Sequence, residues 1–208
     1  MINLSPPKFF TDLFPNPIWR MPGNNSTVYL TFDDGPTEGV TPWVLDKLKE
    51  HSARATFFCL GKKVEMHPDI YQRILDEGHA VGNHSYSHLK GWETRTGQYV
   101  QDVDLAADLI NSKLYRPPYG RIKRSQFRIL NERYKIILWN VLSMDYNRWV
   151  TPKRCANIVL NNIHPGAIVV FHDSKKAEKN MKYGLEKTLE EIKKRNFNYG
   201  LITEESFL

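Results

Sequence analysis

The chain has 208 residues, of which 41% are hydrophobic and 12% aromatic, so it is long and apolar enough to fill a hydrophobic core. No apolar run approaches the roughly 18 residues of a membrane span, and the Pro-rich N-terminus contains no run of signal-peptide length. We therefore expect a soluble protein without a membrane span, cytoplasmic if the N-terminus is native and otherwise associated with the cell envelope.

The net charge of +6 comes largely from lysine and arginine residues between positions 175 and 195, where glutamates are interleaved. Met181, Leu185, Leu189 and Ile192 recur at helical spacing through the same stretch. The basic residues are thus predicted to form the solvent-exposed face of a terminal helix. We expect no nucleic-acid partner, and only a mild attraction to anionic polymers.

Short strand-like runs alternate with longer helical patterns along the chain, which predicts an α/β fold with a mostly parallel sheet. Predicted strands are Val28–Phe32, Ala55–Cys59, Ala80–Gly82, Leu114–Arg116, Lys135–Asn140, Ile168–Phe171 and Tyr199–Ile202. Predicted helices are Thr41–His51, Pro68–Glu77, Tyr99–Lys113, Ser125–Arg133 and Pro152–Ile163, followed by the terminal helix.

Two groups of side chains that could bind a metal follow predicted strands. Asp33 and Asp34 come at the end of the first strand, and His84 and His88 follow the third. The spacing of the histidines predicts that both imidazoles lie on one face of a helical turn, which suits a divalent metal. Because α/β folds keep their active sites at the carboxyl ends of strands, the sequence predicts a catalytic metal site there. One carboxylate plus two imidazoles leaves coordination positions open for water and substrate.

Five successive motifs resemble those of the polysaccharide deacetylase family, the NodB homology domain of carbohydrate esterase family 4. They are Thr31-Phe32-Asp33-Asp34-Gly35-Pro36, His84-Ser85-Tyr86-Ser87-His88, Arg116-Pro117-Pro118-Tyr119-Gly120, Met144-Asp145-Tyr146 and Val169-Val170-Phe171-His172-Asp173. The resemblance implies a distorted barrel of about seven mostly parallel strands. It also implies a catalytic domain over residues 28–208. Residues 1–27 have a turn-rich composition with several aromatic residues, and we expect them to pack along the barrel.

The resemblance assigns Asp34, His84 and His88 to the metal and Asp33 to the general base. It implies a divalent ion, with Zn²⁺ the first choice and Co²⁺, Ni²⁺ and Mn²⁺ also suited to these ligands. Such an ion would polarise the substrate carbonyl and activate water.

The later motifs supply the remaining groups of the implied mechanism. Arg116 would pair with Asp33 and hold it ionised. The amide of Tyr119 is the first free N–H after two prolines, and by resemblance it would bind the oxyanion. His172 would be the general acid for the leaving nitrogen, with Asp145 hydrogen-bonded behind it.

The fourth motif departs from the common family pattern Asp-x-x-Asp-Trp, because the chain has Leu142 and Tyr146 at its outer positions. This change concerns the substrate groove, to which Pro118, Tyr146 and Val170 are expected to contribute. The implied activity is removal of N-acetyl groups from glycans that contain N-acetylglucosamine, such as peptidoglycan or chitin oligomers. The alternatives are an amidase or O-acetyl esterase on a small molecule or other carbohydrate, and a catalytically silent glycan-binding module.

Overall fold

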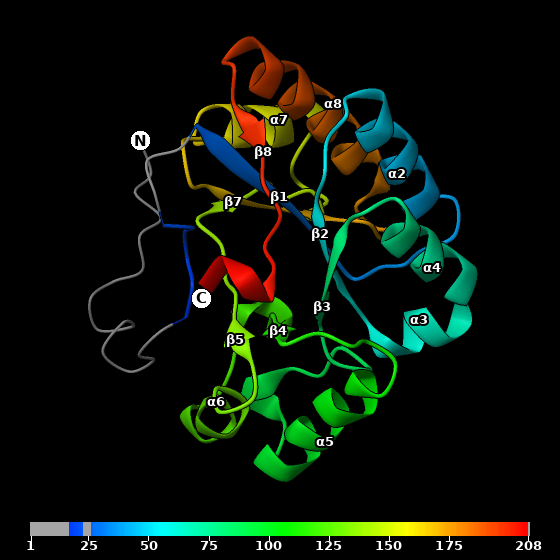
Figure 1. Cartoon of the computed structure of the whole chain (residues 1–208), viewed down its shortest axis with the longest axis vertical. Coiled ribbons are helices and arrows are strands. Elements are labelled where there is room, and N and C mark those ends of the chain that lie inside the picture. The colour runs from blue at the N-terminus through cyan, green and yellow to red at the C-terminus, as the bar shows by residue number, and fades with distance from the viewer. Residues whose placement is uncertain (1–16, 23–25, 208) are drawn as a thin grey trace.

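The computed structural model describes residues 17–22 and 26–207, and all structural statements concern these residues. The sheet runs in the order β5-β4-β3-β2-β1-β7-β6, every neighbouring pair is parallel, and β8 pairs with the start of β1 (Figure 1). The strands are β1 (Thr27–Asp33), β2 (Thr56–Cys59), β3 (Ala80–Asn83), β4 (Leu114–Tyr115), β5 (Lys135–Ile136), β6 (Val141–Leu142), β7 (Ile168–His172) and β8 (Asn198–Tyr199). The expected distorted α/β barrel is confirmed.

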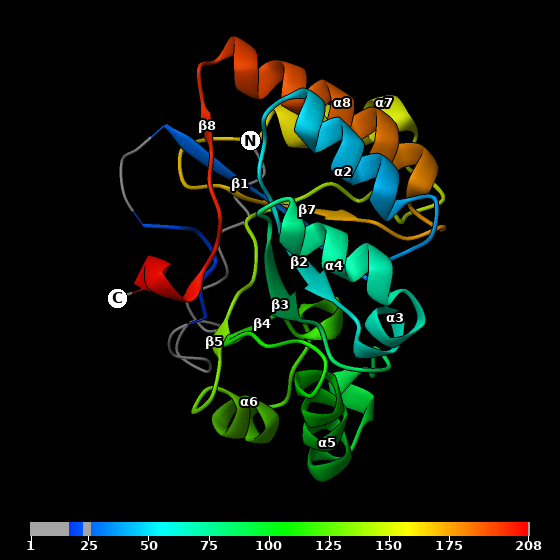
Figure 2. The same cartoon turned by 45° about the vertical axis from the view of Figure 1, so that its right-hand side comes forward.

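Helices connect the strands and cover the outside of the sheet. They are α2 (Thr41–Glu50), α3 (Gly61–Met66), α4 (Pro68–Asp76), α5 (Thr96–Ala107), α6 (Arg124–Leu130), α7 (Pro152–Leu160) and α8 (Glu178–Lys194), with short 3₁₀ turns at Gly91–Glu93, Pro118–Gly120 and Glu204–Phe207. Figures 1 and 2 place α2, α7 and α8 near β1 and β7, and α5 and α6 near β4 and β5. Within the described part of the chain, none of these helices has the length and hydrophobicity that crossing a bilayer requires.

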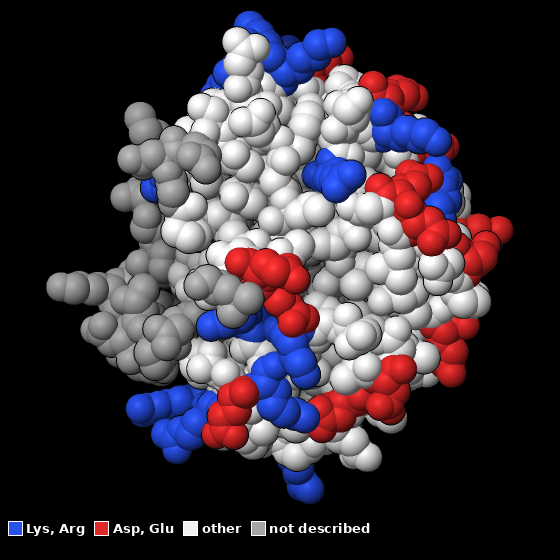
Figure 3. Space-filling model, viewed as in Figure 1, with Lys and Arg blue, Asp and Glu red and all other residues white. Residues whose placement is uncertain are grey.

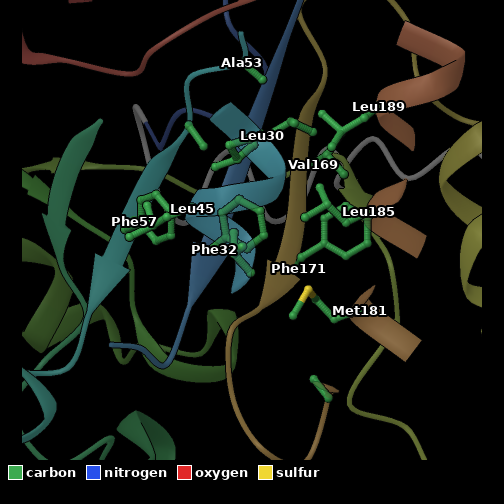
Figure 4. Packing of buried hydrophobic residues seen from close by; sticks show 14 of the residues in the cluster. Leu30, Phe32, Leu45, Ala53, Phe57, Val169, Phe171, Met181, Leu185 and Leu189 are labelled. Carbon is green, nitrogen blue, oxygen red and sulfur yellow. The ribbon is translucent and has the colours of Figure 1, made fainter. Parts of the chain in front are cut away.

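The core lies between the central strands and the helices that cover them. Phe32 of β1 stacks on Phe57 of β2 and on Phe171 of β7, with ring centroids 5.0 and 6.1 Å apart. The apolar stripe predicted for the terminal helix is fully buried in α8 and packs toward the same cluster (Figure 4). Because β1 is the central strand and is held on both sides, the residues at its carboxyl end have fixed positions.

The predicted strand Lys135–Asn140 is wrong as a single element, and this correction shows where the chain passes between the two edge strands of the sheet. β5 ends at Ile136, Ile137 pairs with Ile18, and β6 begins at Val141 on the opposite edge of the sheet. Ile18 donates a hydrogen bond to the carbonyl of Ile136 and accepts one from Leu138, each at 2.8 Å. Residues 137–140 thus cross from one edge of the sheet to the other, and we call this crossing the seam.

Three further differences from the predicted elements are local. The short helix α3 was not predicted, α5 ends at Ala107 rather than at Lys113, and the last strand pairs over Asn198–Tyr199 rather than Tyr199–Ile202. Of the expected N-terminal segment, residues 1–16 and 23–25 lie outside the described residues. The division of the chain at residue 27 therefore stays a prediction.

Candidate active site

The carboxyl ends of the central strands open into a cavity of about 520 Å³. Most residues expected to carry the chemistry lie around it. The lining residues are Asp33, Asp34, His84, His88, Tyr119, Arg121, Trp139, Leu142, Tyr146, His172, Ser174 and Lys176.

Asp34, His84 and His88 come together as a possible metal-binding group, with one ligand atom from each residue within 4.8 Å of the others. Asp34 Oδ1 lies 3.2 Å from Nε2 of His88 and 3.6 Å from Nε2 of His84. This buried oxygen has no hydrogen-bond partner of acceptable geometry among the described residues. Burial raises the pKa of Asp34, but the surrounding imidazoles outweigh burial and lower it below its usual range. An ionised oxygen without a partner, facing two imidazoles, fits a divalent cation.

His84 is held in the tautomer that a metal ligand requires. Its Nδ1 lies 2.7 Å from the carbonyl oxygen of Arg116, and because a carbonyl only accepts, Nδ1 carries the proton. The lone pair is then on Nε2, the atom nearest Asp34. Burial lowers the pKa of His84 to about 4, which keeps the ring neutral near pH 7.

The prediction of a helical turn at His84–His88 is wrong, because these residues form a loop in which Ser85 and His88 have positive φ of 70° and 63°. Asp102 of α5 holds this loop: its carboxylate accepts from the N–H groups of Tyr86 and Ser87 at 3.2 and 3.1 Å, and from the Ser87 hydroxyl at 2.5 Å. Sequence reasoning missed Asp102. The available signal was a single acid within the apolar stripe of a predicted helix.

Asp33 and Arg116 form the buried ion pair that was expected. Nη1 of Arg116 donates to Oδ1 of Asp33 at 2.7 Å and to the hydroxyl of Thr31 at 2.8 Å. Nε and Nη2 donate to the carbonyls of Ile137 and Leu138 in the seam, each at 3.2 Å. Burial lowers the pKa of the fully buried Arg116, and the charge of Asp33 opposes that shift.

Both carboxylate oxygens of Asp145 form hydrogen bonds with His172. One accepts from the backbone N–H of His172 at 2.7 Å, and the other lies 2.7 Å from Nδ1. Burial acts to lower the pKa of His172, but the charge and hydrogen bond of Asp145 outweigh it and raise the pKa to about 9. The imidazolium form therefore persists at neutral pH, with Nε2 as its remaining donor.

The residues expected to contact substrate divide into two groups. Tyr119 and Tyr146 line the cavity, and the edge of Tyr146 meets the ring of His172 at a centroid distance of 5.0 Å. The N–H of Tyr119 has no acceptor among the described residues. Pro118 and Val170 are buried and do not line the cavity; Val170 lies within β7, paired with Leu142, which does line it.

Asp173 is a second residue that sequence reasoning left without a role, although it lies in the fifth motif. It is buried directly behind the loop after β1, where a side chain on Gly35 would collide with its carboxylate. The hydroxyl of Thr41 donates to Oδ2 at 2.5 Å, and Oδ1 has no partner among the described residues. Burial raises the pKa of Asp173 to about 7.

The chain is similar to known proteins over most of its length. A family model described as polysaccharide deacetylase matches residues 20–133. A peptidoglycan-N-acetylglucosamine deacetylase of Bacillus cereus is 38% identical over 160 residues, which make up 74% of this chain and 58% of that protein. A second Bacillus cereus protein of that name is 32% identical over 200 residues, 89% of this chain and 91% of the relative.

A solved structure agrees with these sequence matches. The Bc1960 peptidoglycan N-acetylglucosamine deacetylase aligns with a TM-score of 0.83 at 30% identity, over 97% of this chain and 96% of the other. This likeness extends through β7 and α8, beyond the end of the family-model match. The chain belongs to the polysaccharide deacetylase family.

Proposed function

We propose that the chain is a metal-dependent hydrolase that removes N-acetyl groups from glycans containing N-acetylglucosamine, such as peptidoglycan, chitin oligomers or a related polymer. The observation that carries the proposal is the convergence of Asp33, Asp34 and His172 on one cavity. Arg116 positions Asp33, Asp145 positions His172, and Asp34 faces His84 and His88. The relatives' names, peptidoglycan-N-acetylglucosamine deacetylase, support this substrate class.

Asp34, His84 and His88 would hold the metal. One carboxylate oxygen and two imidazole nitrogens suit Zn²⁺ first, and also Co²⁺, Ni²⁺ or Mn²⁺. When bound, such an ion supplies Lewis acidity, which polarises a carbonyl oxygen and makes water more acidic.

The protein's own groups would carry out the proton transfers. Asp33, with one oxygen occupied by Arg116, accepts a proton from the attacking water through the other oxygen. The N–H of Tyr119 donates to the oxyanion that forms from the acetamide carbonyl. As the C–N bond breaks, Nε2 of His172 donates its proton to the departing nitrogen, and acetate and a free amine are released.

The pairing of His172 with Asp145 favours an amide over an ester as the natural substrate. An amine is a poor leaving group until it is protonated, and a raised imidazole pKa keeps an acid ready for it near pH 7. A silent glycan-binding module would need neither this acid nor the buried base.

The test is acetate release from peptidoglycan, chitin oligomers, acetylated xylan and small amides, with metal-stripped and metal-restored protein. We expect acetate from the N-acetylglucosamine glycans, loss of activity on stripping and recovery with one equivalent of Zn²⁺ or Co²⁺. Activity confined to esters or small amides, or unaffected by stripping, would contradict the proposal.

A matched pair of variants separates the adjacent carboxylates. Asp33→Asn should keep one equivalent of metal and lose about 10²- to 10⁴-fold in turnover, as expected for a general base. Asp34→Ala should lose the metal itself. Elemental analysis and acetate release measure the two effects, and near-normal turnover in Asp33→Asn would assign the base elsewhere.

A further inference from the structure

Two cations line the cavity that the mechanism above does not use, Arg121 and Lys176. We call them the cationic pair. Nζ of Lys176 lies 5.8 Å from the ring centroid of Tyr146, and Arg121 is near enough for its charge to oppose the burial that raises the pKa of Tyr146. Tyr146 in turn contacts His172. The cationic pair is therefore grouped around the ring beside the residue that protonates the leaving nitrogen.

Neither member of the cationic pair has a carboxylate partner or a side-chain hydrogen bond among the described residues. Lys182 and Lys175, in the same stretch of the chain, instead contact Glu178 at 2.7 and 3.8 Å. Arg121 is exposed and stacks its guanidinium over Trp92, with 5.0 Å between Cζ and the ring centroid. Stacking restrains a guanidinium while leaving the N–H groups at its edge free to bind an anion.

The other charges of the cavity do not neutralise this pair. Asp33 is paired with Arg116, and Asp34 faces His84 and His88. Elsewhere the surface charges are mixed: Figure 3 shows Lys and Arg interleaved with Asp and Glu over the face it presents. Two cations without a carboxylate partner among the described residues therefore make their side of the cavity positive, which a neutral glycan would not exploit.

We propose that Arg121 and Lys176 form a subsite for a carboxylate carried by the glycan near the acetamide that is hydrolysed, so that the preferred substrate is an anionic glycan. The inference rests on the proposed function and narrows it, since chitin oligomers are neutral whereas peptidoglycan strands carry carboxylates. Two sources share this chemistry: the lactyl carboxylate of a peptide-free muramic acid residue, and the carboxylates of a stem peptide.

The test compares three substrates of similar length: a chitin oligomer, a peptide-free oligomer of alternating N-acetylglucosamine and N-acetylmuramic acid, and the same oligomer bearing stem peptides. The variants are Arg121→Gln, Lys176→Gln and their combination, with exposed Arg124→Gln and Lys175→Gln as matched controls outside the cavity. We expect kcat/KM on an acidic substrate to fall roughly 3- to 10-fold for each cation removed, mostly through KM. Turnover of the chitin oligomer and the behaviour of the controls should not change.

Loss on the peptide-free acidic oligomer would identify the lactyl carboxylate, and loss only on the peptide-bearing oligomer the stem peptide. Either result supports the subsite, and the wild-type preference should weaken with added salt. Equal losses on neutral and acidic substrates, or no loss on any, would overturn it. Wild-type protein that releases no acetate from any of the three substrates would instead contradict the proposed function.

Discussion

Asp145 occupies both the backbone N–H and the ring Nδ1 of His172, and it accounts for the raised pKa of that histidine. A general acid must be protonated to act, so activity is expected to fall as pH rises through about 9. In Asp145→Asn the anion is gone and burial dominates, so the alkaline limb of the pH–kcat/KM profile should move to lower pH. Ser143→Ala is the control, because the Ser143 hydroxyl contacts the backbone N–H of Asp145, at 3.4 Å, and not the carboxylate that holds His172. An unmoved limb would leave His172 without its acid role.

Asp173 makes a different prediction, about stability. Its pKa of about 7 in the folded protein lies above the roughly 3.9 of an unfolded aspartate. Between these values the native state holds a proton that the unfolded chain has released, so the free energy of unfolding falls as pH rises from about 4 to about 7. The contribution is complete below this window and lost above it.

The amide introduced by Asp173→Asn cannot ionise, so the free energy of unfolding of this variant should not show the fall between about pH 4 and 7. We expect denaturant unfolding at a series of pH values to show this difference. As pH rises through the window, the free energy of unfolding of the variant should increase relative to that of the wild type by at most about 1.4 kcal/mol per pH unit. Exposed Asp108→Asn provides the control. Parallel stability curves for wild type and Asp173→Asn would mean that Asp173 is ionised in the native state.

At the scale of elements, the loop between β3 and α5 depends on a helix for its shape. The carboxylate of Asp102 in α5 accepts three hydrogen bonds from Tyr86 and Ser87, which lie between His84 and His88, and its backbone carbonyl accepts a fourth from the Tyr86 N–H at 3.0 Å. Asp102→Ala should therefore loosen the loop and lower metal affinity roughly 10- to 100-fold, as loss of an outer-shell partner typically does. Competition with a chelator measures this affinity. Asp104→Ala, on the same helix but paired with Arg133, should leave it unchanged, and an unchanged affinity in Asp102→Ala would contradict the assigned support.

The same loop shows what the sequence could and could not predict. The grouping of two imidazoles with one carboxylate of the Asp33-Asp34 pair was predictable, because both groups follow strands whose carboxyl ends meet, and the family resemblance chose Asp34. The non-helical shape of the loop was not predictable, since nothing local in the sequence indicates that Asp102 of a later helix supplies acceptors for the loop's N–H groups. The sequence predicted no role for Asp173, Arg121 and Lys176 for a similar reason, since their roles depend on neighbours far away in the chain.

The predicted strand boundaries were wrong where packing, rather than residue type, determines where a strand ends. The apolar run after Lys135 reads as one strand, yet only its first part belongs to β5, because Ile137 pairs with Ile18 instead. α8, by contrast, was predictable, because its buried stripe recurs through several turns.

For the molecule as a whole, Arg116 connects the candidate site to the seam, the chain that crosses between the two edge strands. It joins Thr31 and Asp33 of β1 to two carbonyls of the seam. Arg116→Met should leave Asp33 buried without its partner and lower the free energy of unfolding by roughly 3–5 kcal/mol. Exposed Arg124→Met should stay within about 0.5 kcal/mol of wild type in denaturant unfolding. A fully stable Arg116→Met protein would show that the seam keeps its position without this side chain.

This double attachment bears on how an inert but intact form of the protein could be obtained, for instance to trap a glycan chain for crystallography. A substitution at Arg116 removes hydrogen bonds to both the central strand and the seam. A protein inactivated at Arg116 would therefore also lose stability. The side chain of His172 lies at the cavity wall, and its hydrogen bond to the rest of the protein is with Asp145. His172 is therefore the better position for a substitution that abolishes hydrolysis and preserves the shape of the cavity.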